Sequence, residues 1–397
     1  MTKIVADDQI LFAREAFSTI GDVLLVAGRE ISPAQVANAD VLLVRSVTTV
    51  DSELLAKSSV QFVGSATSGV EHIDISYLED RGIGFASAVG GNANAVAEYV
   101  LSAIFALLDK QETTLSGQTA AIIGCGRIGC RVLDKLNTMG VDCVINDPPL
   151  KAKTGDRRYL TMDVVLSADI ITVHVPLTRN GAHPTYHLVD DEFLARIKPN
   201  AILINTARGA VVDDEALKVA LSKKDKPAVV LDVWNHEPKI NTELLKNIEI
   251  GTPHIAGYSF DGKLRATEII YTSMCKFFNI RPLWNSNRYL SKRAANVFKI
   301  SRSFTDDEII QMAVFATYDV RRDAASLKQM LRSPHYQRGH YFEDLRTEYP
   351  LRREFDSTLI YLPSNKRRVA RKLRRLGFRI DIHEPAAMMG SGRNSYG

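Results

Sequence analysis

The stretch that decides the fold reads TAAIIGCGRIG and covers residues 119–129. Its first five residues form a short apolar run rich in β-branched side chains, which is typical of a buried strand. The rest spaces Gly124, Gly126 and Gly129 as G-x-G-x-x-G and opens a segment of helical character. Glycines at this spacing allow a tight turn and the close approach of a pyrophosphate, whose charge then lies at the positive end of the helix. The stretch therefore predicts a dinucleotide-binding unit.

An acidic residue stands where such a unit needs one. Asp147 follows Gly129 by 18 residues, at the end of the next predicted strand, residues 143–145. A carboxylate at this place accepts hydrogen bonds from the adenosine ribose and repels a ribose 2′-phosphate. We therefore expect NAD as the cofactor, although Lys151 and Lys153 keep a phosphorylated dinucleotide open as an alternative.

Apolar runs alternate with helical segments through most of the chain, which is the pattern of parallel sheets with helical crossovers. In the first hundred residues we expect strands at 41–44 and 62–64 and a short helix that Ser32 caps. A 3.6-residue period predicts one long helix over residues 94–108. The second series predicts five strands, at residues 119–123, 143–145, 170–173, 201–204 and 229–233. The fold class is therefore α/β, with a doubly wound, Rossmann-type domain.

Beyond residue 257 the pattern changes. Residues 266–278 predict a helix and residues 285–292 a polar linker. The remaining residues predict strands at 297–300, 358–362 and 378–382, a helix that begins near Thr305 and a basic helix over 366–375. We expect a small α+β C-terminal domain over residues 286–385 and a disordered tail over 386–397.

Composition is that of an ordinary globular chain with two or three domains. A length of 397 residues exceeds a single hydrophobic core, and 45% hydrophobic with 24% charged residues excludes general disorder. The N-terminus is charged, and no run reaches the roughly 18 apolar residues of a membrane span, so we expect a cytoplasmic protein without membrane contact. The four cysteines show no metal-ligand spacing, so we expect free thiols and no metal site.

Positive charge is concentrated at the C-terminal end. Residues from 286 onward carry a net charge of +10, and the first 285 residues carry −6. The basic residues of 366–375 alternate with Val369, Leu373 and Leu376 at helical spacing, which indicates an amphipathic helix with a solvated face. We therefore expect no nucleic-acid partner.

Three polar residues follow the later predicted strands: Arg208, Glu237 and His254. Singly, each has an ordinary structural explanation: an arginine paired with Asp213, a solvated loop acid and a histidine held in a turn. Together they match the oxidation of a hydroxyl carbon beside a carboxylate. A guanidinium binds that carboxylate in a two-point fork, an imidazole removes the hydroxyl proton, and an acid fixes the imidazole tautomer. We interpret His254 as the base, Glu237 as its partner and Arg208 as the carboxylate-binding residue.

These motifs resemble those of the D-2-hydroxyacid dehydrogenase family, whose catalytic arginine, glutamate and histidine they match. The resemblance implies a flavodoxin-like substrate-binding domain of residues 1–97 together with 257–285, and an NAD-binding domain of residues 98–256. Besides the glycine motif, it implies cofactor contacts at Arg127, Ile128, Asp147, Asp232 and Gly257. It implies substrate contacts at Ser46, Thr67 and Tyr258, and position and chemistry make Arg45, Ser46 and Tyr258 candidates for binding a phosphate. Val175 departs from the family pattern at a cofactor-contacting position.

The resemblance also covers the last domain, where the segments at residues 318–323 and 345–354 are the most specific. It implies NAD-dependent oxidation of a small-molecule substrate, 4-phospho-D-erythronate, to 2-oxo-3-hydroxy-4-phosphobutanoate in pyridoxal 5′-phosphate synthesis. It also implies a homodimer formed through the last domain, whose paired arginines could reach a partner's substrate. Two alternatives remain: oxidation of D-3-phosphoglycerate, and an NAD-binding scaffold similar to corepressors of the same family.

Overall fold

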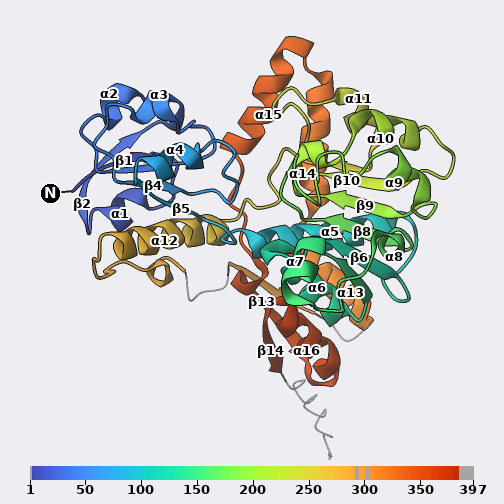
Figure 1. Cartoon of the computed structure of the whole chain (residues 1–397). Coiled ribbons are helices and arrows are strands. Elements are labelled where there is room, and N and C mark those ends of the chain that lie inside the picture. Colours follow the sequence, from blue (N-terminus) through green and yellow to red (C-terminus); the bar gives the residue numbers. More distant parts are fainter. Residues whose placement is uncertain (1, 291–294, 301–303, 384–397) are drawn as a thin grey trace, which may run out of the picture.

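The computed structural model describes residues 2–290, 295–300 and 304–383, in three parts that each contain one parallel sheet (Figure 1). The N-terminal part (blue) and the central part (green) lie to the left and right in Figure 1. Helix α15 (Arg338–Thr347) of the C-terminal part stands between them. Within the described residues, no helix is long and apolar enough to cross a membrane.

The N-terminal sheet has the order β2-β1-β3-β4-β5, and all its neighbouring strands are parallel, which is the flavodoxin-like arrangement. Its strands are β1 (Thr2–Asp7), β2 (Gly21–Val26), β3 (Val41–Val44), β4 (Phe62–Ser65) and β5 (Gly84–Ser87). Its short helices are α1 (Ala13–Phe17), α2 (Pro33–Val36), α3 (Ser52–Leu55) and α4 (Ile75–Asp80). The strands predicted at 41–44 and 62–64 are confirmed, and so is the short helix, whose capping box joins Ser32 and Gln35.

A helix from much later in the chain completes this part. Helix α12 (Phe260–Phe277) buries Leu264, Ile270 and Met274 against the N-terminal sheet. The helix predicted for residues 266–278 therefore begins earlier than expected, because the hydroxyl of Ser259 accepts the Gly262 N–H at 2.8 Å and caps it.

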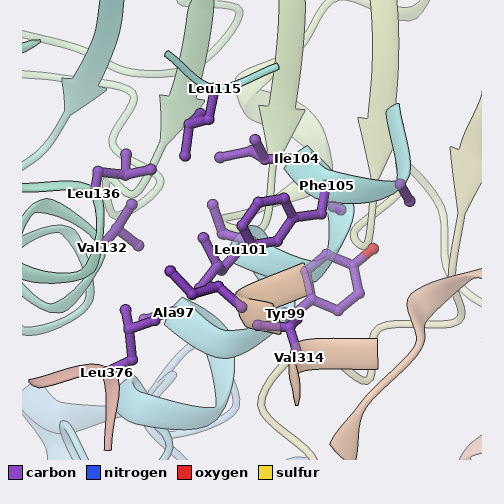
Figure 2. Close-up of a cluster of buried hydrophobic side chains, with 14 of the residues drawn as sticks. Ala97, Tyr99, Leu101, Ile104, Phe105, Leu115, Val132, Leu136, Val314 and Leu376 are labelled. Carbon is purple, nitrogen blue, oxygen red and sulfur yellow. The ribbon is translucent and has the colours of Figure 1, made fainter. Parts of the chain in front are cut away.

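Helix α5 (Ala93–Lys110) connects the N-terminal and central parts and is buried along most of its length, which confirms the long predicted helix. Figure 2 shows Tyr99 and Leu101 of this helix in one cluster with Val132 of α6 (Arg127–Met139) and Val314 and Leu376 of the C-terminal part. Since one apolar cluster includes residues of the central and the C-terminal parts, these two parts pack directly on each other.

The central sheet has the order β11-β10-β9-β8-β6-β7 and is entirely parallel. Its strands are β6 (Thr119–Ile123), β7 (Asp142–Asn146), β8 (Ile170–Val173), β9 (Ile202–Asn205), β10 (Ala228–Leu231) and β11 (Ile250–Gly251). Its helices besides α6 are α7 (Pro148–Thr154), α8 (Met162–Leu166), α9 (Asp191–Arg196), α10 (Asp214–Leu221) and α11 (Thr242–Asn247). The five predicted strands are confirmed, but β10 ends at Leu231, and the two-residue strand β11 was missed because it is too short to show a pattern.

The C-terminal sheet is also parallel, in the order β12-β13-β14. Its strands are β12 (Asn296–Lys299), β13 (Thr358–Pro363) and β14 (Arg379–His383). Its helices besides α15 are α13 (Asp306–Thr317), α14 (Val320–Gln329) and α16 (Arg367–Leu376). Helix α16 buries Val369, Leu373 and Leu376 and exposes most of its basic residues, which confirms the predicted amphipathic helix. Helices α14 and α15 were not predicted, and the tail of residues 386–397 lies outside the described residues.

Buried polar contacts fix the C-terminal part to the start of α12. The carboxylate of Glu354 accepts hydrogen bonds from Ser259 at 2.7 Å and from Asn94 at 2.8 Å. The buried guanidinium of Arg352 donates to the main-chain carbonyl of Ala256 at 3.1 Å. The C-terminal part is therefore attached to the segment that follows His254.

Candidate active site

The glycine loop joins β6 to α6. Gly124 has a φ of +86°, and a Cβ added there would lie 2.7 Å from the carbonyl oxygen of His174. A Cβ on Gly129 would lie 2.0 Å from the carbonyl oxygen of Gly124, so both positions require glycine. A Cβ on Gly126 would meet no atom within 4 Å, and no side chain caps the N-terminus of α6. The loop therefore leaves open space at a positive helix end, which fits a dinucleotide pyrophosphate.

Asp147 lies directly after β7, beside this loop. Its carboxylate accepts the Cys125 N–H at 2.8 Å and the Leu150 N–H at 3.0 Å. These bonds hold the side chain at the sheet edge where the ribose of a bound dinucleotide lies in this fold. Arg127 and Ile128 begin α6 next to it. The residues present thus fit NAD.

Arg208, Glu237 and His254 come from loops that follow β9, β10 and β11, which are adjacent strands. Because the carboxyl ends of parallel strands meet at one edge of a sheet, the three side chains gather there. All three line one cavity of about 790 Å³.

Glu237 and His254 form a direct pair. Nδ1 of His254 lies 2.8 Å from Oε2 of Glu237, and Oε1 accepts the Trp234 N–H at 2.9 Å. Burial raises the pKa of the Glu237 carboxyl, but the charge and hydrogen bond of His254 and the Trp234 N–H outweigh burial and lower it overall. The ionised carboxylate orients the ring, so that Nε2 remains for a substrate hydroxyl.

The loop that carries His254 has an unusual backbone. His254 has a φ of +57°, a region that side chains other than glycine rarely adopt. Asp232 holds this conformation: its main-chain carbonyl accepts the His254 N–H at 2.8 Å, and its buried carboxylate accepts the N–H groups of Ile255 and Ala256. Burial raises the pKa of Asp232. The observed contacts of Asp232 therefore position His254, and the cofactor contact expected there stays a prediction.

Arg208 faces the N-terminal part. Its Nε donates to Oε1 of Glu71 at 2.6 Å, and a Cβ on Gly69 would lie 2.2 Å from its Nη2. Burial raises the pKa of Glu71, but the hydrogen bond and charge of Arg208 lower it overall. The alternative pairing of Arg208 with Asp213 is wrong, because Asp213 caps α10 instead. The Glu71 carboxylate is thus bound to the same guanidinium that we expect to bind a substrate carboxylate.

The predicted substrate-binding residues lie on two elements. Arg45 and Ser46 follow β3, where Nε of Arg45 donates to the buried Asp7 at 3.0 Å and Ser46 is exposed. Thr67 follows β4, and its hydroxyl bonds with Ser65. Tyr258 lies just before α12, near Gly257, where a Cβ would meet Asn92.

Sequence reasoning missed the residues that surround Tyr258. Nζ of Lys263 lies 4.9 Å from the centre of the Tyr258 ring, and Nη2 of Arg346 donates to the Tyr258 hydroxyl at 3.2 Å. The position of Lys263 near the start of α12 was a usable signal, because a cation is unfavourable at that helix end. Arg346 gave no such signal of a contact with Tyr258, because it belongs to a helix that is distant in the sequence.

The paired arginines of the C-terminal part are bonded within their own chain. Arg352 is buried, Arg353 donates to Asp261 at 3.0 Å, and Arg321 donates to Asp319 at 2.8 Å.

Two family models match separate parts of the chain. Residues 92–256 match the model described as "D-isomer specific 2-hydroxyacid dehydrogenase, NAD binding domain". Residues 289–377 match "Domain of unknown function (DUF3410)". A solved structure of NAD⁺-bound 3-phosphoglycerate dehydrogenase from Entamoeba histolytica is 22% identical with a TM-score of 0.60, over 70% of this chain and 95% of that chain, which shows the fold. Fold, glycine loop and family match define an oxidoreductase of the NAD-dependent 2-hydroxyacid dehydrogenase class.

Relatives that match over nearly the full chain identify one family within this class. A protein of Hahella chejuensis named erythronate-4-phosphate dehydrogenase is 42% identical over 95% of this chain and 99% of its own length. One of Marinobacter nauticus with the same name is 40% identical over 96% of this chain and 100% of its own length. The chain belongs to the erythronate-4-phosphate dehydrogenase family. The resemblance inferred from the sequence is thereby confirmed.

Proposed function

We propose that this chain oxidises C2 of 4-phospho-D-erythronate with NAD, giving 2-oxo-3-hydroxy-4-phosphobutanoate and NADH in pyridoxal 5′-phosphate synthesis. The observation that carries the proposal is the His254–Glu237 pair, 2.8 Å apart, in one cavity with Arg208. The names of the full-length relatives support the choice of substrate.

In this mechanism Arg208 exchanges Glu71 for the substrate carboxylate and orients C2. Nε2 of His254 takes the C2 hydroxyl proton as the C–H bond breaks and the carbonyl forms. Glu237 stabilises the resulting imidazolium. The glycine loop and Asp147 would hold NAD, which would supply the acceptor for the hydride from C2.

The test is NADH formation by the purified protein with 4-phospho-D-erythronate and, separately, with D-3-phosphoglycerate. A parallel product assay with a 2-oxo acid acceptor detects turnover even where NADH stays bound. Preference for 4-phospho-D-erythronate supports the proposal. Preference for D-3-phosphoglycerate contradicts the proposed substrate but is consistent with the proposed mechanism. Binding of NADH without turnover of either compound would favour a scaffold role.

We also propose that the chain forms a homodimer through its C-terminal part. Val297 on the edge strand β12 is 58% exposed and Met312 on α13 is 42% exposed, so both offer apolar surface to a second copy. Light scattering tests this: a mass of about twice 44.0 kDa supports the dimer, and the single-chain mass contradicts it.

We further propose a cytoplasmic location, which is supported by the membership of the chain in a family of metabolic dehydrogenases. Cell fractionation tests it.

A further inference from the structure

Two cations from different parts of the chain lie beside the Tyr258 ring. Lys263 belongs to α12, and its Nζ is 4.9 Å from the centre of the tyrosine ring. Arg346 belongs to α15, and its Cζ is 5.9 Å from the same centre. Tyr258 itself follows the catalytic His254 by four residues. Two positive charges therefore lie beside the segment that follows the catalytic His254.

Lys263 differs from most of its neighbours in the ion pairs it makes. Among the described residues, no carboxylate pairs with its ammonium, which rests over the Tyr258 ring. It stands in the first turns of an 18-residue helix, where the helix dipole already favours an anion. Partial burial and the nearby guanidinium of Arg45 lower the pKa of Lys263, although solvent still reaches the side chain. The positive charges of Arg45 and Lys263 thus lie near each other, and no carboxylate among the described residues balances the charge of Lys263.

Arg346 also has unused hydrogen-bonding capacity. Its Nη2 donates to the Tyr258 hydroxyl at 3.2 Å, while its buried Nε has no hydrogen-bond partner among the described residues. A buried donor without a partner is costly, and a ligand oxygen would remove that cost. The charge of Glu237 acts on Arg346, which places this guanidinium close to the catalytic pair.

We propose that Lys263 and Arg346, which both lie beside Tyr258, bind the terminal phosphate of the substrate with the assistance of Arg45. The proposed substrate carries a carboxylate at one end and a dianionic phosphate at the other, and Arg208 serves the carboxylate. Three cations and a hydroxyl match the charge and the several acceptor oxygens of a phosphate. The C-terminal part thereby selects phosphorylated substrates in its own chain. This inference rests on the proposed function.

The experiment compares 4-phospho-D-erythronate with unphosphorylated D-erythronate as substrates of the full-length protein. For the wild type, Lys263→Met and Arg346→Leu, the ratio of the two kcat/KM values is measured with NAD. Each variant should lower this ratio by about 10-fold to 100-fold, the effect of losing a charge-assisted hydrogen bond. Arg346→Lys should recover part of it, because the charge remains.

Matched controls separate phosphate binding from a change in fold. Lys276→Met on α12 and Arg332→Leu beside α14 remove exposed cations away from Tyr258 and should leave the ratio at the wild-type value. A wild-type ratio in both Lys263→Met and Arg346→Leu would overturn the inference, even if absolute activity falls. If the wild type prefers D-3-phosphoglycerate, the proposed function fails, and the same ratio measured with D-3-phosphoglycerate and D-glycerate still decides the inference. If neither phosphorylated compound turns over, both ideas are rejected.

Discussion

The two ends of the proposed substrate site are built in different ways. At the catalytic end, Arg208, Glu237 and His254 follow three adjacent strands of one sheet. At the other end, the cations around Tyr258 come from the N-terminal part, from α12 and from α15. One sheet fixes the reacting groups, whereas three separate segments must pack correctly to form the proposed phosphate site.

This difference predicts separable defects. Substitutions at the catalytic end should lower turnover of every 2-hydroxy acid, because they act on the reacting atoms. Substitutions around Tyr258 should change which acid is preferred. At the catalytic end, the expected effects decrease from the base His254 to the more distant Glu71.

Replacing the base should have the largest effect. His254→Ala is expected to lower kcat by about 10²–10⁴-fold, because no other group takes the hydroxyl proton, while NADH binding stays near the wild-type value. Stopped-flow measurement of NADH formation and a fluorescence titration of NADH check the two statements. His340→Ala, an exposed histidine on α15, is the control. Normal turnover in His254→Ala would refute its role as base.

Glu237→Gln should lower kcat by about 10²-fold, because an amide does not stabilise the imidazolium. Glu243→Gln on α11 is the matched control. A wild-type kcat in Glu237→Gln would contradict the functional pairing.

Stability gives a second check on Glu237. Its folded-state pKa is lower than the usual 4.5, so the ionised form stabilises the fold above that pH and this contribution is lost as the pH falls below it. The melting temperature of Glu237→Gln should therefore fall less than that of the wild type on acidification in this range.

Arg208→Lys should mainly raise KM, by about 10-fold, because an ammonium cannot make the two-point contact with a carboxylate. Steady-state kinetics with 4-phospho-D-erythronate measure it. Unchanged KM would exclude Arg208 as the carboxylate-binding residue.

The smallest effect is expected at Glu71, which pairs with Arg208 at 2.6 Å. Glu71→Gln removes a competitor of the substrate carboxylate and should lower KM by about 2-fold to 5-fold, the scale of a solvent-exposed ion pair. Glu79→Gln, an exposed acid on α4, should leave KM unchanged. A higher KM in Glu71→Gln would show that Glu71 assists binding instead.

The catalytic end could be predicted from the sequence because its signals are local. Gly124, Gly126 and Gly129 follow a strand directly, and Asp147 follows the next one. Each catalytic residue follows one strand of the central sheet: Arg208 follows β9, Glu237 follows β10 and His254 follows the short β11. Parallel strands place the residues that follow them at one edge of the sheet.

Arg45 and Tyr258 were predicted as phosphate-binding candidates, but two sets of contacts could not be predicted, because they cross the chain: the pairing of Arg208 with Glu71, and the contacts of Tyr258 with Lys263 and Arg346. Glu71 and Arg208 are separated by 137 positions, and Tyr258 and Arg346 by 88. No periodicity or spacing connects such residues. The helix that carries Arg346 was also missed, since α15 has a weakly amphipathic sequence with one fully buried residue, Phe342.

The most direct test of this account measures kcat/KM for 4-phospho-D-erythronate and D-erythronate in His254→Ala and Arg346→Leu side by side. We predict that His254→Ala lowers both values and keeps their ratio, whereas Arg346→Leu lowers the ratio. If both variants lower the two values in equal proportion, the division of the proposed substrate site into a catalytic and a phosphate-binding end is wrong.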